Sequence, residues 1–126
     1  MQLAQVVQHV QTMLGTCGIT EELRVLLLRL LAHRGRILHP GSAGEWPTIV
    51  LEICQAFDGD PAAVVIAASA IECATAAVDV IDDLLDEEWT PGAVEPRRRL
   101  NAGLALSQFA QHCLHELPAL ISAERV

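Results

Sequence analysis

The chain contains no tyrosine, and aromatic residues make up only 3% of its 126 residues. Alanine, leucine and valine dominate instead, and 52% of the residues are hydrophobic. This composition favours helices that pack closely on one another. At this length the chain forms at most one domain with one core. We therefore expect a single all-α domain over residues 1–126, built as an antiparallel bundle of about five helices.

Other absences restrict the class of protein. The cysteines form no Cys-X-X-Cys pair, and three of the four lie in apolar helical segments where free buried thiols are usual: Cys54, Cys73 and Cys113. No secretory signal is present, so we expect a reducing, cytoplasmic setting. The strongly apolar, uncharged run over residues 61–71 is too short to span a bilayer. The net charge of −8 argues against nucleic acid and anionic membrane as partners.

Apolar periodicity and helix-breaking residues divide the chain. They predict helices over residues 2–14, 20–33, 47–57, 61–88 and 98–116, with loops over 33–45 and 89–96. The third helix is expected to turn five apolar side chains inward: Ile49, Val50, Ile53, Cys54 and Phe57. His112 and His115 have the spacing of a metal-ligand pair, but no third ligand accompanies them in sequence, so surface histidines are the better interpretation. The sequence shows no internal repeat and no low-complexity segment.

The predicted fourth helix carries a row of acids on one side. At about 100° per residue, five carboxylates fall within roughly a 100° sector: Glu72, Asp79, Asp82, Asp83 and Asp86. Apolar residues cover the rest of that helix, which is the pattern of a buried helix. The acids are therefore expected to face an enclosed cavity, where their mutual repulsion raises their pKa values unless a divalent cation is bound. Hard cations such as Mg²⁺ prefer carboxylate oxygens and leave positions open for phosphates. The plainer alternative is a solvated acidic face continued by Glu87 and Glu88.

The same stretch carries a family resemblance. Residues 70–72 (Ala-Ile-Glu), followed by Asp82-Asp83-Leu84-Leu85-Asp86, resemble the first aspartate-rich motif of the all-trans polyprenyl diphosphate synthases. Residues 35–40 (Gly-Arg-Ile-Leu-His-Pro) are similar to that family's Gly-Lys-Arg-Leu-Arg-Pro segment. Residues 46–60 fit the preceding helix and turn, and residues 100–106 (Leu-Asn-Ala-Gly-Leu-Ala-Leu) resemble the start of the next helix. The resemblance covers residues 35–115 and implies half of the class I isoprenoid synthase fold.

The resemblance also implies a site. Asp82 and Asp86 would bridge Mg²⁺, with Asp83 as a supporting ligand, and the metal would bind and ionise an allylic prenyl diphosphate. Arg36 and His39 stand where that family binds the diphosphate of the second substrate, and the neighbouring Arg34 could also bind its oxygens. The alternative for Arg34 and Arg36 is two exposed arginines on a loop. The small residues Ala77 and Val78 occupy the places that limit product length, so a deep pocket and a long product are expected.

Several family features are missing. No Arg-Arg-Gly segment follows the aspartates, the loop over residues 33–45 has gained Gly-Ser-Ala-Gly, and Leu104 replaces the aspartate that usually follows Asn-Ala-Gly. The family's second aspartate-rich motif has no counterpart here.

Three interpretations stay open. The first is a prenyl synthase-like subunit completed by a partner or by a second copy. The second is a degenerate interaction or regulatory subunit whose acids pair with a partner's basic residues. The third is a helical bundle with an incidental acidic patch.

Overall fold

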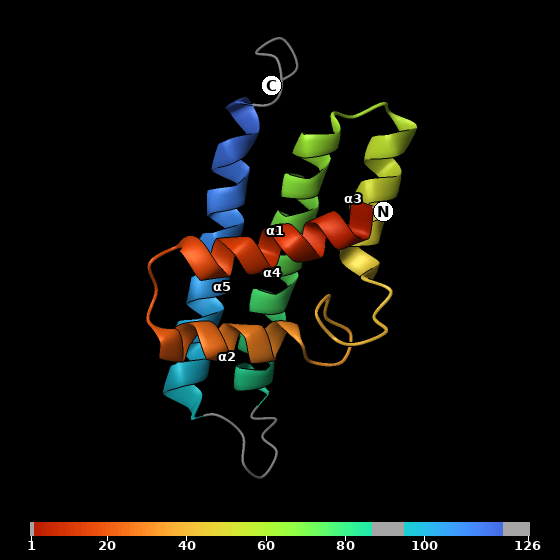
Figure 1. Cartoon of the computed structure of the whole chain (residues 1–126). Helices are drawn as coiled ribbons and strands as arrows, with labels where there is room; N and C mark the ends of the chain where they lie inside the picture. Colours follow the sequence, from red (N-terminus) through yellow and green to blue (C-terminus); the bar gives the residue numbers. More distant parts are fainter. Residues whose placement is uncertain (1, 87–94, 120–126) are drawn as a thin grey trace.

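The computed structural model describes residues 2–86 and 95–119, and this part of the chain is all-α (Figure 1). The five helices are α1 (Gln2–Thr16), α2 (Glu21–Leu31), α3 (Glu45–Ala56), α4 (Pro61–Leu85) and α5 (Pro96–Glu116). A short 3₁₀ helix, η1 (Leu117–Ala119), follows α5. The all-α fold predicted from composition and periodicity is confirmed.

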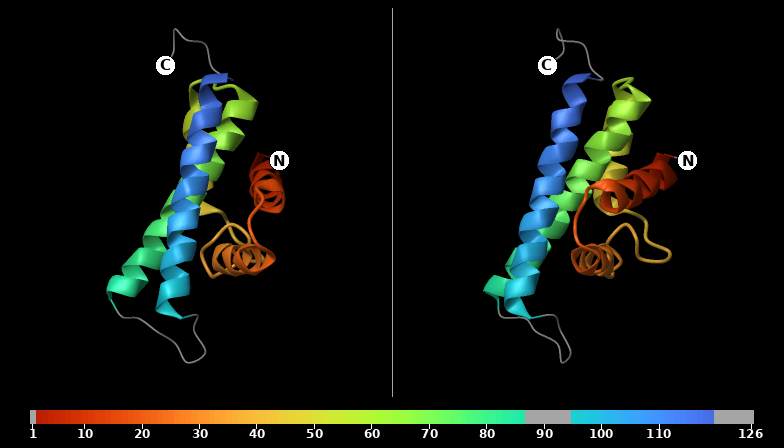
Figure 2. Two further views of the ribbon diagram at one scale, coloured as in Figure 1. Left: turned by 90° about the vertical axis from the view of Figure 1, so that its left-hand side faces the viewer. Right: turned by 60° about the vertical axis from the view of Figure 1, so that its left-hand side comes forward.

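The helices form two layers. α3, α4 and α5 run side by side and alternate in direction, whereas α1 and α2 lie across one side of this layer (Figure 2). The α4–α5 interface is the most extensive, followed by α3–α4 and α1–α4. The predicted antiparallel arrangement therefore holds for α3–α5, and α1 and α2 cross it.

Local signals explain where α4 begins and ends. The Asp60 carboxylate accepts hydrogen bonds from the backbone N–H groups of Ala62 and Ala63, and Pro61 occupies the first turn. The helix ends at Leu85, where the Asp86 N–H donates to the Asp82 carbonyl. We expected it to reach Glu88, which lies outside the described residues.

By length and composition, α4 is the one helix of the described residues that is long and apolar enough to cross a membrane. It packs against α1, α3 and α5, and half of its most apolar window is buried inside the protein. Core helices of this kind pass the same test, so the apolar character of α4 is weak evidence for a membrane span.

The core lies between the two layers. Apolar stripes of α1 and α2 supply much of it: Val6, Val10, Met13, Leu14, Leu26, Leu27 and Leu31. All four cysteines are free; Cys73 and Cys113 are buried, Cys54 is half-buried and Cys17 is exposed. Burial raises the pKa of the Cys73 thiol to about 12 and that of the Cys113 thiol to about 11.

The layer of α3, α4 and α5 is covered on one side only. Nine of the ten large apolar side chains exposed among the described residues belong to these helices or to the C-cap of α3. On α4, Ser69 contacts α1 through His9, and Val78 lies nine residues later, roughly 180° around the helix. We call the exposed apolar residues of α4 and α5 the open face: Val78, Leu85, Leu100, Leu104 and Leu114.

The predicted inward face of α3 is only partly right, because Val50 and Cys54 are half-buried and pack against the core as expected, but the other three residues do not. Ile49, Ile53 and Phe57 are exposed, whereas Pro47 and Leu51 are buried. α3 is apolar on more than one side, and it packs mainly on α4 and α1. The stripe that points away from those two helices therefore remains uncovered, although its periodicity is as good as that of the buried stripe.

Candidate functional site

The five acids of α4 occupy three different environments. Glu72 is buried, with its side chain 2% exposed, whereas the side chains of Asp83 and Asp79 are 46% and 62% exposed. Asp82 and Asp86 are also exposed. The acids thus lie along the boundary between the covered and uncovered sides of α4. The expectation that all five face an enclosed cavity is wrong, because no described element covers the side that carries Asp82 and Asp86.

Glu72 anchors the connection between α2 and α3. Its Oε1 atom accepts a hydrogen bond of 2.8 Å from the backbone N–H of Ile37 and lies 3.8 Å from Nη1 of Arg36. The same Arg36 nitrogen donates to Thr75 Oγ1 at 2.8 Å. Burial raises the pKa of the Glu72 carboxyl, and the Ile37 N–H and the Arg36 charge oppose that shift. Glu72 therefore acts in the structure as the acceptor that fixes residues 36 and 37 against α4.

Arginines pair with two of the other acids, Asp79 and Asp83. Arg36 Nη2 lies 3.0 Å from Asp79 Oδ2, and Arg99 Nη2 of α5 lies 3.3 Å from Asp83 Oδ2. A polar cavity of about 100 Å³ lies between these pairs, lined by Leu30, His33, Arg34, Arg36, Ala76, Asp79, Val80, Asp83 and Arg99. Three guanidinium groups around two carboxylates leave little negative potential for a cation. This cavity is better suited to a small anion than to Mg²⁺.

Of the three residues proposed for diphosphate binding, two share one cavity and the third does not. Arg34 is exposed and, like Arg36, lines the small polar cavity, but Arg36 is buried and bound to the acids of α4. His39 is directed elsewhere, because its Nδ1 atom lies 3.1 Å from the Ala32 carbonyl oxygen and holds the loop to the end of α2. Of the two residues expected to floor the product pocket, Ala77 is buried, whereas Val78 is 64% exposed on the open face.

Asp82 and Asp86 remain as the acids available to a ligand. They are one turn apart, and among the described residues neither forms an ion pair. Val78 and Leu85 lie on the same side of α4, so the two carboxylates adjoin exposed hydrocarbon. No group of three or more metal-binding side chains gathers within residues 2–86 and 95–119. A cation bound here would need further ligands from water, from a substrate or from another chain.

The sequence interpretation underestimated Arg99. Arg99 is 9% exposed and pairs with Asp83, while Arg98 pairs with Glu22 of α2 at 3.2 Å. The signal was present in the periodicity, because Arg99 precedes Ala102 and Leu106, both fully buried, by three and seven residues. An arginine in register with a core stripe indicates a partner acid on the neighbouring helix. His112 and His115 are exposed, as expected.

Comparisons of the chain with protein-family models, with curated proteins and with solved structures gave no match. The described residues define an all-α protein whose exposed large apolar side chains gather mainly on α3, α4 and α5.

Proposed function

We propose that this protein is a subunit of a prenyl diphosphate synthase-like assembly. Asp82 and Asp86 bind Mg²⁺ and, through it, the diphosphate of an allylic prenyl substrate, while a second polypeptide covers the open face. The observation that supports the proposal is the placement of two unpaired carboxylates, one turn apart, beside the exposed Val78 and Leu85. A prenyl diphosphate has the same two parts, because a charged head that binds metal is joined to a hydrocarbon chain.

Covering the open face would strengthen this site. Carboxylates exposed to water hold Mg²⁺ weakly, because the ion keeps its own waters. Excluding water lowers the local dielectric and strengthens the attraction between metal and diphosphate. The apolar side chains beside the metal would then shelter the prenyl chain and a developing carbocation.

The binding proposal is tested by calorimetric titration of the protein with farnesyl diphosphate in the presence of Mg²⁺. Because loss of even a secondary contact to a metal site costs about 10–100-fold in affinity, we expect Asp82→Ala/Asp86→Ala to weaken binding at least ~100-fold. Glu45→Ala/Glu52→Ala removes two exposed acids from α3 and is expected to leave binding unchanged. Identical isotherms for the parent and the Asp82/Asp86 variant would refute metal-assisted binding at these residues.

A second candidate function is a non-catalytic interaction subunit that uses the same face. Two observations favour it: Asp79 and Asp83 are already paired with arginines, and large apolar side chains are exposed on α3, α4 and α5. The chain contains no Arg or Lys between Arg36 and Arg97, so a surface that complements this region is basic. Under this function Mg²⁺ and prenyl diphosphate do not bind, but a protein partner does.

Both functions require that the open face be covered, and in the purified chain only other copies are available to cover it. We therefore expect particles larger than the 13.6 kDa monomer in sedimentation velocity experiments. Val78→Glu/Leu104→Glu places charges on the open face and should yield the monomer. Val25→Glu, at an exposed valine of α2 outside the open face, is the control and should sediment like the parent. A parent chain that stays monomeric at all concentrations would argue against association through this face.

A further inference from the structure

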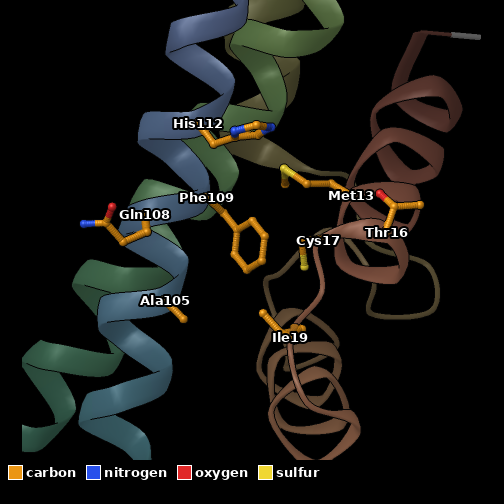
Figure 3. Close-up of a pocket in the computed structure, with 8 residues that line it drawn as sticks. All are labelled: Met13, Thr16, Cys17, Ile19, Ala105, Gln108, Phe109 and His112. Atoms are coloured by element: carbon orange, nitrogen blue, oxygen red, sulfur yellow. The ribbon is translucent and has the colours of Figure 1, made fainter.

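A second cavity lies on the other side of α5 from the open face (Figure 3). It has a volume of about 440 Å³ and lies between the C-terminal end of α1, the connection from α1 to α2, and α5. Its lining consists of Met13, Thr16, Cys17, Ile19, Ala105, Gln108, Phe109 and His112. Phe109 is nine residues from Leu100, roughly half a turn around the helix, so the cavity is separate from the residues of the proposed function.

The lining selects a neutral, mainly apolar ligand. It includes no Arg, Asp or Glu, and its one imidazole, His112, already contacts Glu116, so no side chain is left to compensate a charged ligand. The inner wall is formed by the Met13 thioether and the Phe109 ring, which are only 7% and 8% exposed. A sulfur atom and an aromatic edge both make favourable contacts with an aromatic ring. The wall therefore favours an aromatic ligand over a polar one.

The polar atoms of the lining are mostly occupied. The Thr16 hydroxyl donates to the Thr12 carbonyl at 2.9 Å, and the Cys17 thiol donates to the Leu14 carbonyl at 3.5 Å. In Figure 3 the Gln108 amide points away from the Phe109 ring. The His112 ring extends over the cavity, and its Nε2 lies 3.0 Å from Glu116 Oε1. When Nε2 of the neutral imidazole donates to Glu116, Nδ1 is left as an acceptor.

The volume sets the size of the ligand. A cavity of about 150 Å³ is enough for benzene, so about 440 Å³ accommodates two fused rings or a ring with a short side chain. We propose that this cavity binds a neutral aromatic molecule of about two fused rings that carries one hydroxyl or ring N–H donor. The rings lie against Met13 and Phe109, and the donor bonds to His112.

The proposal is tested by measuring the affinities of 2-naphthol and 2-methoxynaphthalene for the full chain by NMR titration. The two probes share the ring system, but only 2-naphthol can donate a hydrogen bond. One such bond is worth roughly a fivefold difference in affinity, so we expect 2-naphthol to bind about five times more tightly. In His112→Phe the preference should disappear. Equal affinities in the parent, or a preference that survives in His112→Phe, would overturn the assignment of the donor.

The location of the binding site is tested with a substitution that fills the cavity. Ala105→Leu adds three carbon atoms to the lining, and we expect at least ~5-fold weaker binding of 2-naphthol. Ala4→Leu makes the same change at an exposed position of α1 outside the cavity and should bind like the parent. Parent-like binding by Ala105→Leu would overturn the site.

Protection of Cys17 gives a readout that needs no variant. Cys17 lines the cavity and is exposed, whereas burial raises the pKa values of Cys73 and Cys113 and keeps those thiols protonated at pH 8. Iodoacetamide labelling followed by peptide mass spectrometry should show that 2-naphthol slows alkylation of Cys17 and not of Cys54. An unchanged Cys17 rate at saturating 2-naphthol would overturn the proposal even if Ala105→Leu does not fold.

Discussion

Replacing Glu72 by leucine is expected to lower the free energy of unfolding by about 3 kcal/mol. The Ile37 N–H would lose its 2.8 Å acceptor while buried, and the buried Arg36 guanidinium would lose one of its two carboxylate neighbours. Apolar burial of the new side chain offsets only part of that cost. Denaturation by urea, followed by circular dichroism, measures the change.

The other acid bound to Arg36 provides the matched control. Asp79 approaches the guanidinium more closely than Glu72 does, at 3.0 Å, but its side chain is 62% exposed. Ion pairs in contact with water contribute little, so Asp79→Ala is expected to cost less than about 1 kcal/mol. A cost for Asp79→Ala equal to that for Glu72→Leu would show that the arginine pairing, and not the buried acceptor, holds residues 36 and 37.

Glu72→Gln keeps an acceptor for Ile37 and isolates the effect of ionisation. Burial raises the folded-state pKa of Glu72 above its ordinary value of 4.5, so the folded protein binds this proton more tightly than the unfolded chain does. The contribution of Glu72 to stability is therefore largest below pH 4.5 and decreases as the pH rises through the folded-state pKa. The stability of the parent relative to Glu72→Gln should fall over that window. A relative stability that rises with pH would mean that Arg36 and Ile37 outweigh burial.

Gly103→Leu is expected to cost about 3 kcal/mol, because it forces α4 and α5 apart. A Cβ atom at position 103 would lie 3.3 Å from Val80 Cγ1 and 3.5 Å from Ile81 Cγ1, so there is no room for the remainder of a leucine side chain. Small buried residues such as Ala77 and Ala102 allow the same close approach. Since α4 and α5 form the most extensive interface, the whole domain should unfold at lower urea concentration.

Gly103→Ala separates packing from helix propensity. Alanine gains about 1 kcal/mol of helix propensity over glycine, and the tight contact with Val80 opposes that gain. We expect a net change within about 1 kcal/mol. Asn101→Leu, at an exposed position on the same helix, controls for the leucine side chain. If Gly103→Leu unfolds at the same urea concentration as the parent, the α4–α5 packing is looser than this structure indicates.

The number and approximate bounds of the helices could be predicted because their signals are local. The Asp60–Pro61 start of α4 depends on neighbouring residues alone, and so does the turn that precedes it. The core stripes of α1 and α2 follow from the same local pattern, because each of these helices is clearly apolar on one side. For α3 and α4 the same reasoning was insufficient, since both are apolar on more than one side.

The sequence by itself determined the relative angles of the five acids around α4, because those angles follow from 3.6 residues per turn. Only the tertiary structure decided which of these five side chains are covered by other parts of the protein. Glu72 meets Ile37 and Arg36 across thirty-five and thirty-six positions of sequence, and Asp83 meets Arg99 of α5. Asp82 and Asp86 remain exposed to solvent. The periodicity of a single helix places its side chains relative to one another, but the orientation of that helix depends on packing against residues distant in the sequence.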